Sequence, residues 1–171
     1  MDETPRLLLL IPTTSYRTED YLAAGRRLGV EVAVGSNKDS VLEPLADGRI
    51  TRVDFADAER AVDQIARYAA RYPLAGIVGV DEGTTTIAAS ASDRLGLPHN
   101  PPTAVAASAN KYRFRQVLTE AGLPQPIARL FAATEDPLAA ARQINNYPVV
   151  LKPLQLSASR GVIRADNAED F

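Results

Sequence analysis

The 171-residue sequence contains no cysteine, and this absence removes several classes of chemistry. Without thiols there is no disulfide, no thiolate nucleophile and no zinc site built on cysteine, and the composition fits a reducing compartment. The only histidine, His99, lies in "LPHNPP" and has no second histidine or cysteine with which to share a metal. We therefore interpret His99 as a loop residue rather than a metal ligand.

Long apolar runs are also missing. The run at residues 7–11 is too short for a signal-peptide core or a membrane span, and the residues before it carry acidic side chains. The net charge of −2 gives no general attraction to nucleic acid or to an anionic membrane surface. We therefore expect a cytoplasmic protein that binds neither nucleic acid nor membrane.

Two familiar nucleotide-binding motifs are absent. The first apolar run continues as "LLLLIPTTSY", without the G-x-G-x-x-G of a classical dinucleotide-binding domain. The G-x-x-x-x-G-K-[ST] sequence of a P-loop is found nowhere in the chain, which excludes that enzyme class. Internal repeats and low-complexity tracts are lacking as well, so the chain is not a repeat protein.

What is present is a globular composition, 46% hydrophobic and 23% charged, with alternating strand and helix patterns in the first hundred residues. This alternation predicts an α/β fold, a parallel sheet covered by helices on both faces. We expect strands at 7–11, 30–34, 50–55 and 75–80, helices at 18–28, 57–72 and 84–95, and a weak helical turn at 41–48.

The apolar spacing also predicts which helix residues face the core. These inward-facing positions are Leu22, Gly25 and Leu28 in the first helix; Ala58, Ala61, Val62, Ile65 and Ala69 in the second; and Ile87, Ala88, Ala91 and Leu95 in the third.

Ligands approach parallel sheets at the carboxyl ends of the strands. Thr13 and Thr14 follow the first predicted strand, and Asp81 and Glu82 follow the fourth, so these four residues are candidates for binding a substrate. An alternative remains open, in which Asp81 caps the following helix and Glu82 is a solvated acid.

The proline-rich segment 97–105 marks a predicted domain boundary, and we expect one domain at residues 1–100 and another at 101–171. The second domain should contain a helix from Lys111 to a stop at Gly122, a strand at 126–132, a helix at 136–145, and paired strands at 148–152 and 161–164. Residues 166–171 then open like another helix. Because these elements make a thin core, we expect the N-terminal part of a longer protein, or a domain that leans on a partner.

Positive charge gathers where the helix at Lys111 begins, after Asn110. Arg113 and Arg115 follow within the same turn. A helix N-terminus with added cations suits a phosphate group. The alternative is that these side chains point into water, where screening makes their mutual repulsion cheap.

A second cationic feature lies in "YPVVLKPLQLSASRGV". Lys152 ends an apolar strand, and the loop that follows offers the hydroxyls of Ser157 and Ser159 before Arg160 and Gly161. Hydroxyls and backbone N–H groups beside two cations make a reasonable cover for a phosphate. Two alternatives stay open: Lys152 extends to water at the strand end, and the loop is an exposed hairpin.

Together, "NKYRFRQVLTEAGLPQP" and the later "YPVVLKPLQLSASRGV" resemble the opening of the ATP-grasp ligase superfamily in both order and spacing. The preceding region, including "GLPHNPPTAVAASANK", resembles the pre-ATP-grasp domain of carboxylate–amine ligases and biotin carboxylase-like enzymes. The resemblance covers nearly the whole chain. It implies a Rossmann-like pre-ATP-grasp domain, followed by the incomplete first α+β portion of an ATP-grasp domain.

The resemblance also implies roles for individual residues. Lys111 and Lys152 would contact the phosphates of ATP, and Ser157, Ser159 and Gly161 would belong to the covering loop. Relatives usually carry several glycines in this loop, whereas "LQLSASRG" contains Gly161 alone.

The implied activity is an ATP-dependent ligation. A small carboxylate would be activated as an acylphosphate and attacked by an amine or similar nucleophile, with Mg²⁺ as a second cofactor. By resemblance, the Mg²⁺ ligands and most of the adenine pocket are expected beyond Phe171, so we expect this chain alone to be inactive, and we assign it no catalytic residue. Pairing as a homodimer is a further implication. The alternative is a non-catalytic α/β domain that binds a nucleotide or a partner.

Overall fold

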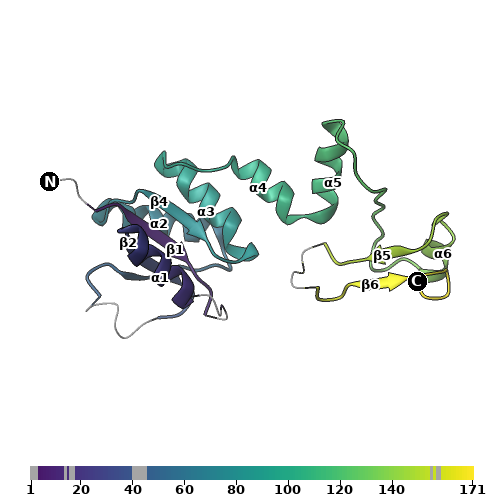
Figure 1. The fold of residues 1–171 in the computed structure, drawn as a ribbon, viewed down its shortest axis with the longest axis horizontal. Helices are drawn as coiled ribbons and strands as arrows, with labels where there is room; N and C mark the ends of the chain where they lie inside the picture. The colour runs from purple at the N-terminus through teal and green to yellow at the C-terminus, as the bar shows by residue number, and fades with distance from the viewer. Residues whose placement is uncertain (1–3, 14, 16–17, 40–45, 155, 157–158) are drawn as a thin grey trace. The chain divides into compact units, whose positions relative to one another are not determined.

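A computed structural model describes residues 4–13, 15, 18–39, 46–154, 156 and 159–171 (Figure 1). The chain divides into two compact units, Met1–Ala106 and Ala107–Phe171. Within the described residues, no helix combines the length and the apolar character that crossing a membrane requires.

The first unit is built on a four-stranded parallel sheet, as the alternation predicts. The strand order is β3-β2-β1-β4, and all three pairings are parallel. The elements in chain order are β1 Arg6–Leu10, α1 Thr18–Leu28, β2 Glu31–Ser36, β3 Ile50–Arg52, α2 Ala58–Arg71, β4 Gly76–Gly79 and α3 Glu82–Leu95. The expected α/β fold class is confirmed.

Helices cover both faces of this sheet (Figure 1). Leu8 and Leu10 of β1 belong to one buried cluster with Ile65 of α2 and Ile87 of α3. Leu9 is also buried but lies outside that cluster, as expected because neighbouring strand residues point to opposite faces. α1 therefore covers one face, and α2 and α3 pack together on the other.

Glycine at position 25 permits the close approach of α1 to the sheet. A Cβ at this position would lie 2.3 Å from Cγ2 of Val32 in β2. That separation is far below van der Waals contact, so a larger residue would push the helix away from the strand. Gly25 is thus a core position, as its spacing predicts.

The second unit has little regular structure. Its elements are α5 Lys111–Glu120, α6 Pro137–Ala141, β5 Val149–Leu151 and β6 Ile163–Ala165. β5 and β6 pair antiparallel, with Val149 opposite Ala165 and Leu151 opposite Ile163. This is the predicted hairpin, with β6 displaced by one to two residues. α4, Pro102–Ala109, spans the junction between the two units.

Several expectations about burial in the first unit are wrong. Leu28 is 74% exposed because it occupies the last turn of α1, where the helix has run past the strand beneath it. Ala58 is exposed for the corresponding reason at the start of α2, and Tyr68 takes a buried place on that helix. The apolar run at 75–80 is typical of a buried strand, yet Val78 is 38% exposed because β4 is an edge strand rather than a central one.

Residues 102–105 of the proline-rich segment belong to helix α4, since proline is tolerated in the first turn of a helix. Two other expectations fail on element type or length. Residues 126–132 have strand-like sequence but form no strand, because no partner pairs with them among the described residues. α6 ends at Ala141 rather than 145, and residues 142–145 are turn or irregular.

The last expected helix does not form. The side chain of Asn167 accepts hydrogen bonds from the N–H groups of Glu169 and Asp170, which is a helix-capping pattern, but no helical turn follows. The weak helical turn predicted at 41–48 falls partly on residues 41–45, outside the described residues. Residues 46–48 form a turn.

Candidate functional site

The carboxyl edge of the parallel sheet brings together the candidates of the first unit. β1 and β4 are neighbours, so Thr13 and Asp81 follow adjacent parallel strands at the same edge. The N–H of Thr13 donates to the side-chain oxygen of Asn37, which follows β2, over 3.1 Å. Thr13 and Glu82 are exposed at this edge. Thr14 lies outside the described residues.

Helix α3 begins tightly against this edge. Oγ1 of Thr84 contacts the carbonyl oxygens of Leu10 at 3.2 Å and of Asp81 at 2.9 Å. A Cβ on Gly79 would lie 2.7 Å from the backbone of Thr84. The end of β4 and the first turn of α3 therefore fit together only with glycine at position 79.

Asp81 occupies the N-cap of α3 with extended backbone, φ −118° and ψ 157°. Its N–H donates to Oγ1 of Thr84 over 3.3 Å. Asp81 therefore occupies the N-cap position that the capping alternative gives it. Glu82 is the first helical residue, where an acidic side chain is favoured by the helix dipole.

In the second unit, Asn110 starts α5. Its side chain accepts from the N–H groups of Tyr112 at 3.1 Å and Arg113 at 3.0 Å, which fixes Lys111 as the first residue of the helix. The Lys111 ammonium donates to the carbonyl oxygens of Leu154, at 3.2 Å, and Leu156, at 2.7 Å. The side chain thereby reaches a segment more than forty positions further along the chain.

Lys152 directly follows the last residue of β5 and is exposed. It therefore bears no burial cost, and its place at the strand end, rather than within the strand, resolves the apparent conflict of a lysine in an apolar run. Leu154, which Lys111 contacts, is only two residues further on. The structure thus brings the Lys111 ammonium to the beginning of the loop that Lys152 opens.

Two residues near the end of that loop have left-handed backbone. Ser159 has φ 58° and Gly161 has φ 67°. A Cβ on Gly161 would lie 2.9 Å from Cγ of Pro153, so the end of the loop returns against its start. Ser157 lies outside the described residues.

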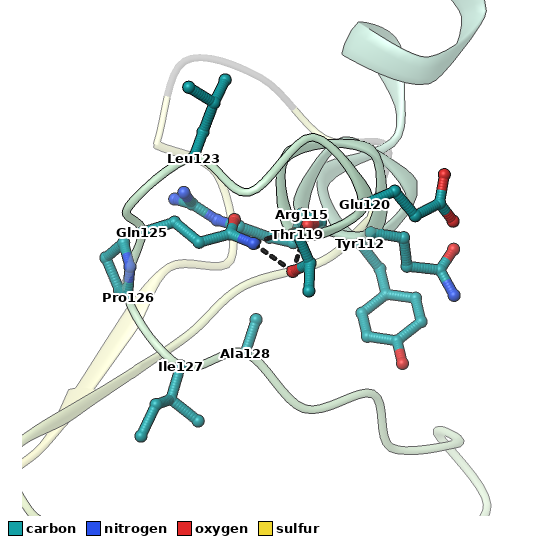
Figure 2. A pocket seen from close by; sticks show the side chains of 10 residues that line it. Tyr112, Arg115, Thr119, Glu120, Leu123, Gln125, Pro126, Ile127 and Ala128 are labelled. Atoms are coloured by element: carbon teal, nitrogen blue, oxygen red, sulfur yellow. Dashed lines mark hydrogen bonds between the residues drawn. The ribbon is translucent and has the colours of Figure 1, made fainter.

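Of two cavities in the described part of the chain, one is lined by Arg115, a cation of the predicted phosphate site at the start of α5, and neither is lined by Lys111, Lys152 or the candidate residues of the sheet edge. One, of about 580 Å³, lies between α5 and the extended segment after it (Figure 2). There the Gln125 side-chain amide donates to the carbonyl of Arg115, at 2.7 Å, and to the hydroxyl of Thr119. The oxygen of that amide is buried without a partner in the described structure.

Sequence reasoning assigned no role to Gln125. The available signal was its place in "GLPQP", a polar residue between two prolines directly after a helix stop. The prolines hold the segment extended, which lets the amide return to the helix. The second cavity lies in the first unit.

Comparison with known proteins identifies most of the first unit, including β4 and the start of α3 but not β1. Residues 22–99 match the ATP-grasp N-terminal domain. Across 172 residues the chain is 28% identical to "Uncharacterized protein y4rH" of Sinorhizobium fredii, covering 99% of this chain and 36% of that protein.

Solved structures show the same fold. An L-amino acid ligase from Bacillus licheniformis superposes with a TM-score of 0.72 at 24% identity, over 99% of this chain and 41% of the ligase. Phosphoribosylglycinamide synthetase from Anaerococcus prevotii gives 0.59 at 17% identity, over 98% and 40%. The biotin carboxylase domain of a single-chain bacterial carboxylase gives 0.54 at 17%, over 98% and 38%.

The chain therefore spans about two fifths of the length of the proteins it matches. These matches agree with the resemblance found in the sequence: residues 22–99 match the ATP-grasp N-terminal domain, and the fold matches ATP-grasp ligases over nearly the whole chain.

Proposed function

We propose that the chain is part of an ATP-dependent ligase that activates a small carboxylate as an acylphosphate, for attack by an amine or a similar nucleophile. The match of residues 22–99 to the ATP-grasp N-terminal domain supports the class of enzyme. The ligase from Bacillus licheniformis, which shares the fold over 99% of this chain, supports the same class. Within the chain, the observation that carries the proposal is the contact of Lys111 with the loop after Lys152.

ATP would be held by its phosphates at that loop. The Lys111 ammonium has neutral carbonyl acceptors at 2.7 and 3.2 Å, and a phosphate oxygen is a stronger acceptor because it is charged. Lys152 is exposed and free to turn toward the same anion. Ser157, Ser159 and Gly161 would cover it with hydroxyls and backbone N–H groups.

Bound ATP would supply the phosphoryl group that the carboxylate accepts. The substrate would lie at the carboxyl edge of the parallel sheet, where Thr13 and Thr14 offer hydroxyl donors to a carboxylate. Asp81 and Glu82 would attract a cationic group on the same molecule. No group of three histidine or acidic side chains in the described part could hold a metal ion, so we assign Mg²⁺ to none of these residues.

The chain offers a direct test because it contains only three lysines, Lys38, Lys111 and Lys152. Reductive methylation with ¹³C-formaldehyde labels each ammonium and keeps its charge, so that each gives its own NMR signal. Titration with ATP should shift the signals of Lys111 and Lys152 and leave Lys38 in place. Equal shifts of all three signals, or no shift at Lys111 and Lys152, would contradict the proposed site.

Affinity provides the second measurement. Loss of one charge-assisted contact of about 1.5 to 3 kcal/mol predicts that Lys152→Ala weakens ATP binding by about one to two orders of magnitude in calorimetry. Lys38→Ala is the matched control, an exposed lysine of the first unit, and should bind like the parent chain. An unchanged affinity in Lys152→Ala would instead favour the non-catalytic interaction domain.

A further inference from the structure

A second cavity, of about 720 Å³, lies in the first unit along the outer edge of β3. Three consecutive residues of this strand, Ile50, Thr51 and Arg52, line it together with residues of α2. Side chains alternate between the two faces of a sheet, so a cavity reached by three neighbours in one strand lies at the strand's edge rather than on one face. β3 is the end strand of the sheet, and this edge has no strand beside it in the described structure.

The backbone at this edge presents hydrogen-bonding groups outward. The carbonyl of Arg49 accepts from Val34, and the N–H of Val53 donates to Ser36, both over 2.8 Å, so positions 49 and 53 face β2. Backbone groups alternate in direction along a strand, which turns those of Ile50 and Arg52 toward the outer edge. The cavity therefore has main-chain donors as well as side chains on its wall.

The charged side chains around the cavity are mainly cationic. Arg52, Arg67 and Arg71 line it, against a single acid, Asp47. Arg67 and Arg71 are four residues apart and so share one face of α2. No hydrogen bond or ion pair holds Arg67 among the described residues.

The other two arginines are only weakly engaged. Arg52 pairs with Asp39 at 3.1 Å, but both side chains are more than half exposed, at 51% and 77%. Exposed pairs of this kind contribute little and exchange readily for a better anion. The guanidinium of Arg71 lies over the Tyr72 ring, 5.6 Å from its centre, which leaves its N–H groups available.

The far wall of the cavity is fixed in advance. The hydroxyl of Tyr68 donates to the carbonyl of Gly48, and a Cβ on Gly48 would lie 2.6 Å from the Tyr72 ring. The turn before β3 is thereby locked onto α2. A ligand would find the cavity formed, and little ordering would be required on binding.

We infer that this cavity binds a small molecule that carries two or more adjacent anionic groups, an organic diphosphate or a polycarboxylate. Guanidinium groups recognise phosphate and carboxylate oxygens in pairs, and three of them surround a space of the size that small ligands fill. The site lies wholly in the first unit and shares no residue with the ATP site proposed above. The inference about this cavity is therefore independent of the proposed ATP site.

Calorimetry on the 171-residue chain tests the inference, with pyrophosphate and citrate as probes at low ionic strength. Arg67→Gln and Arg71→Gln should each weaken binding of the preferred probe by about tenfold, because each removes a charge-assisted contact. Arg60→Gln is the matched control: it is an exposed arginine of the same helix, pairs with Asp54 at 3.5 Å and does not line the cavity. It should leave the affinity unchanged.

Three results would overturn the inference. The first is that neither probe binds, and the second is that Arg60→Gln weakens binding as much as Arg67→Gln, which would indicate a diffuse field. The third is that binding is lost in Lys111→Ala and Lys152→Ala but kept in Arg67→Gln, which would place the anion in the ATP site instead. Circular dichroism of each variant checks that these exposed substitutions leave the fold intact.

Discussion

The two units of the chain differ in what they bury. In the first unit the fully buried side chains include Leu8, Leu10, Val53 and Ile65, gathered between the sheet and two helices. In the second unit the buried hydrophobic residues are alanines. Its larger apolar side chains are half-buried or exposed, and the exposed ones in the described part are Phe114, Leu123, Ile127, Leu130, Leu138, Val150, Leu156, Val162 and Ile163.

This difference follows from architecture rather than from composition. A parallel sheet with helices on both faces encloses its central strand, so every residue of β1 can lose solvent. A two-stranded hairpin cannot enclose a strand in this way, and isolated hairpins are marginal in water. Because full burial of a leucine contributes about 1.5 to 3 kcal/mol, the first unit holds most of the stability of the chain.

The contrast also bears on how each candidate site would work. The sheet edge in the first unit is held by contacts such as that between Thr84 and Leu10, at 3.2 Å, so a substrate would meet a rigid surface. Loops that close on ligands are drawn from regions of low local stability. The hairpin of β5 and β6, which carries Lys152, belongs to such a region.

The same truncation of leucine to alanine in each unit tests whether only the first unit has a stabilising core. Leu8→Ala leaves a cavity in the core of the first unit and should lower the free energy of unfolding by about 2 to 5 kcal/mol. Leu138→Ala removes the same atoms from a side chain that is 63% exposed, and should cost less than about 1 kcal/mol. Urea denaturation followed by circular dichroism measures both. Similar losses in the two variants would mean that the second unit has a core of its own.

Two glycines in the first unit test how tightly the start of α3 packs against the sheet edge. Gly79→Ala would place a Cβ 2.7 Å from the backbone of Thr84, which cannot move aside as a flexible side chain could. We expect a loss of about 1 to 3 kcal/mol from overpacking. Gly83→Ala, four residues later, meets nothing within 4 Å and lies in α3, where alanine is the better helix former.

Thermal denaturation of the two glycine variants distinguishes the cases. Gly79→Ala should lower the melting temperature, while Gly83→Ala should hold or raise it. A stable Gly79→Ala protein would show that the start of α3 is less firmly seated on β4 than the structure indicates. The candidate substrate edge would then be adjustable rather than rigid.

The first unit could be predicted from its sequence almost element by element, because its elements follow from local patterns. The apolar run before Pro12 gives β1, and helix stops at Gly29 and Gly96 adopt the left-handed backbone that glycine favours. The wrong expectations concern burial at helix ends and at the edge strand. Burial there depends on the length of the neighbouring element, which no local pattern contains.

The second unit was harder to predict because its elements depend on distant partners. Residues 126–132 have the sequence of a strand but no partner in the described structure, and propensity alone cannot form one. Of the candidate site residues, sequence pattern indicated that Lys111 begins a helix. That its ammonium meets the carbonyls of Leu154 and Leu156 is a tertiary fact, which spacing does not encode.

The cavity at β3 could not be predicted from the sequence either, because it also depends on tertiary contacts. Arg67 and Arg71 read as the solvated face of an amphipathic helix, and Arg52 as an alternating residue of a short strand. Only the packing of α2 beside the edge strand brings the three cations around one space.

Tyr68 offers the test with the smallest expected effect. Its hydroxyl joins α2 to the turn before β3 through a hydrogen bond to the carbonyl of Gly48. Its ring is buried, and burial raises the pKa of the Tyr68 phenol above its ordinary value, although the neighbouring Arg6 guanidinium acts in the opposite direction. The ordinary tyrosine pKa is about 10, so above that pH the unfolded chain loses the proton first. The unfolding free energy should therefore be intact below about pH 10 and fall as the pH rises toward the raised pKa of the folded state.

Tyr68→Phe separates the two contributions of this residue. At neutral pH the variant should lose about 1 kcal/mol, because the carbonyl of Gly48 loses its donor. Above pH 10 it should lose less stability per pH step than the parent chain, since phenylalanine has no proton to release. Urea denaturation at pH 7, 9.5 and 10.5 measures both effects. An alkaline slope that is unchanged in Tyr68→Phe would show that another group drives the loss, and that Tyr68 anchors the turn at Gly48 without controlling its pH dependence.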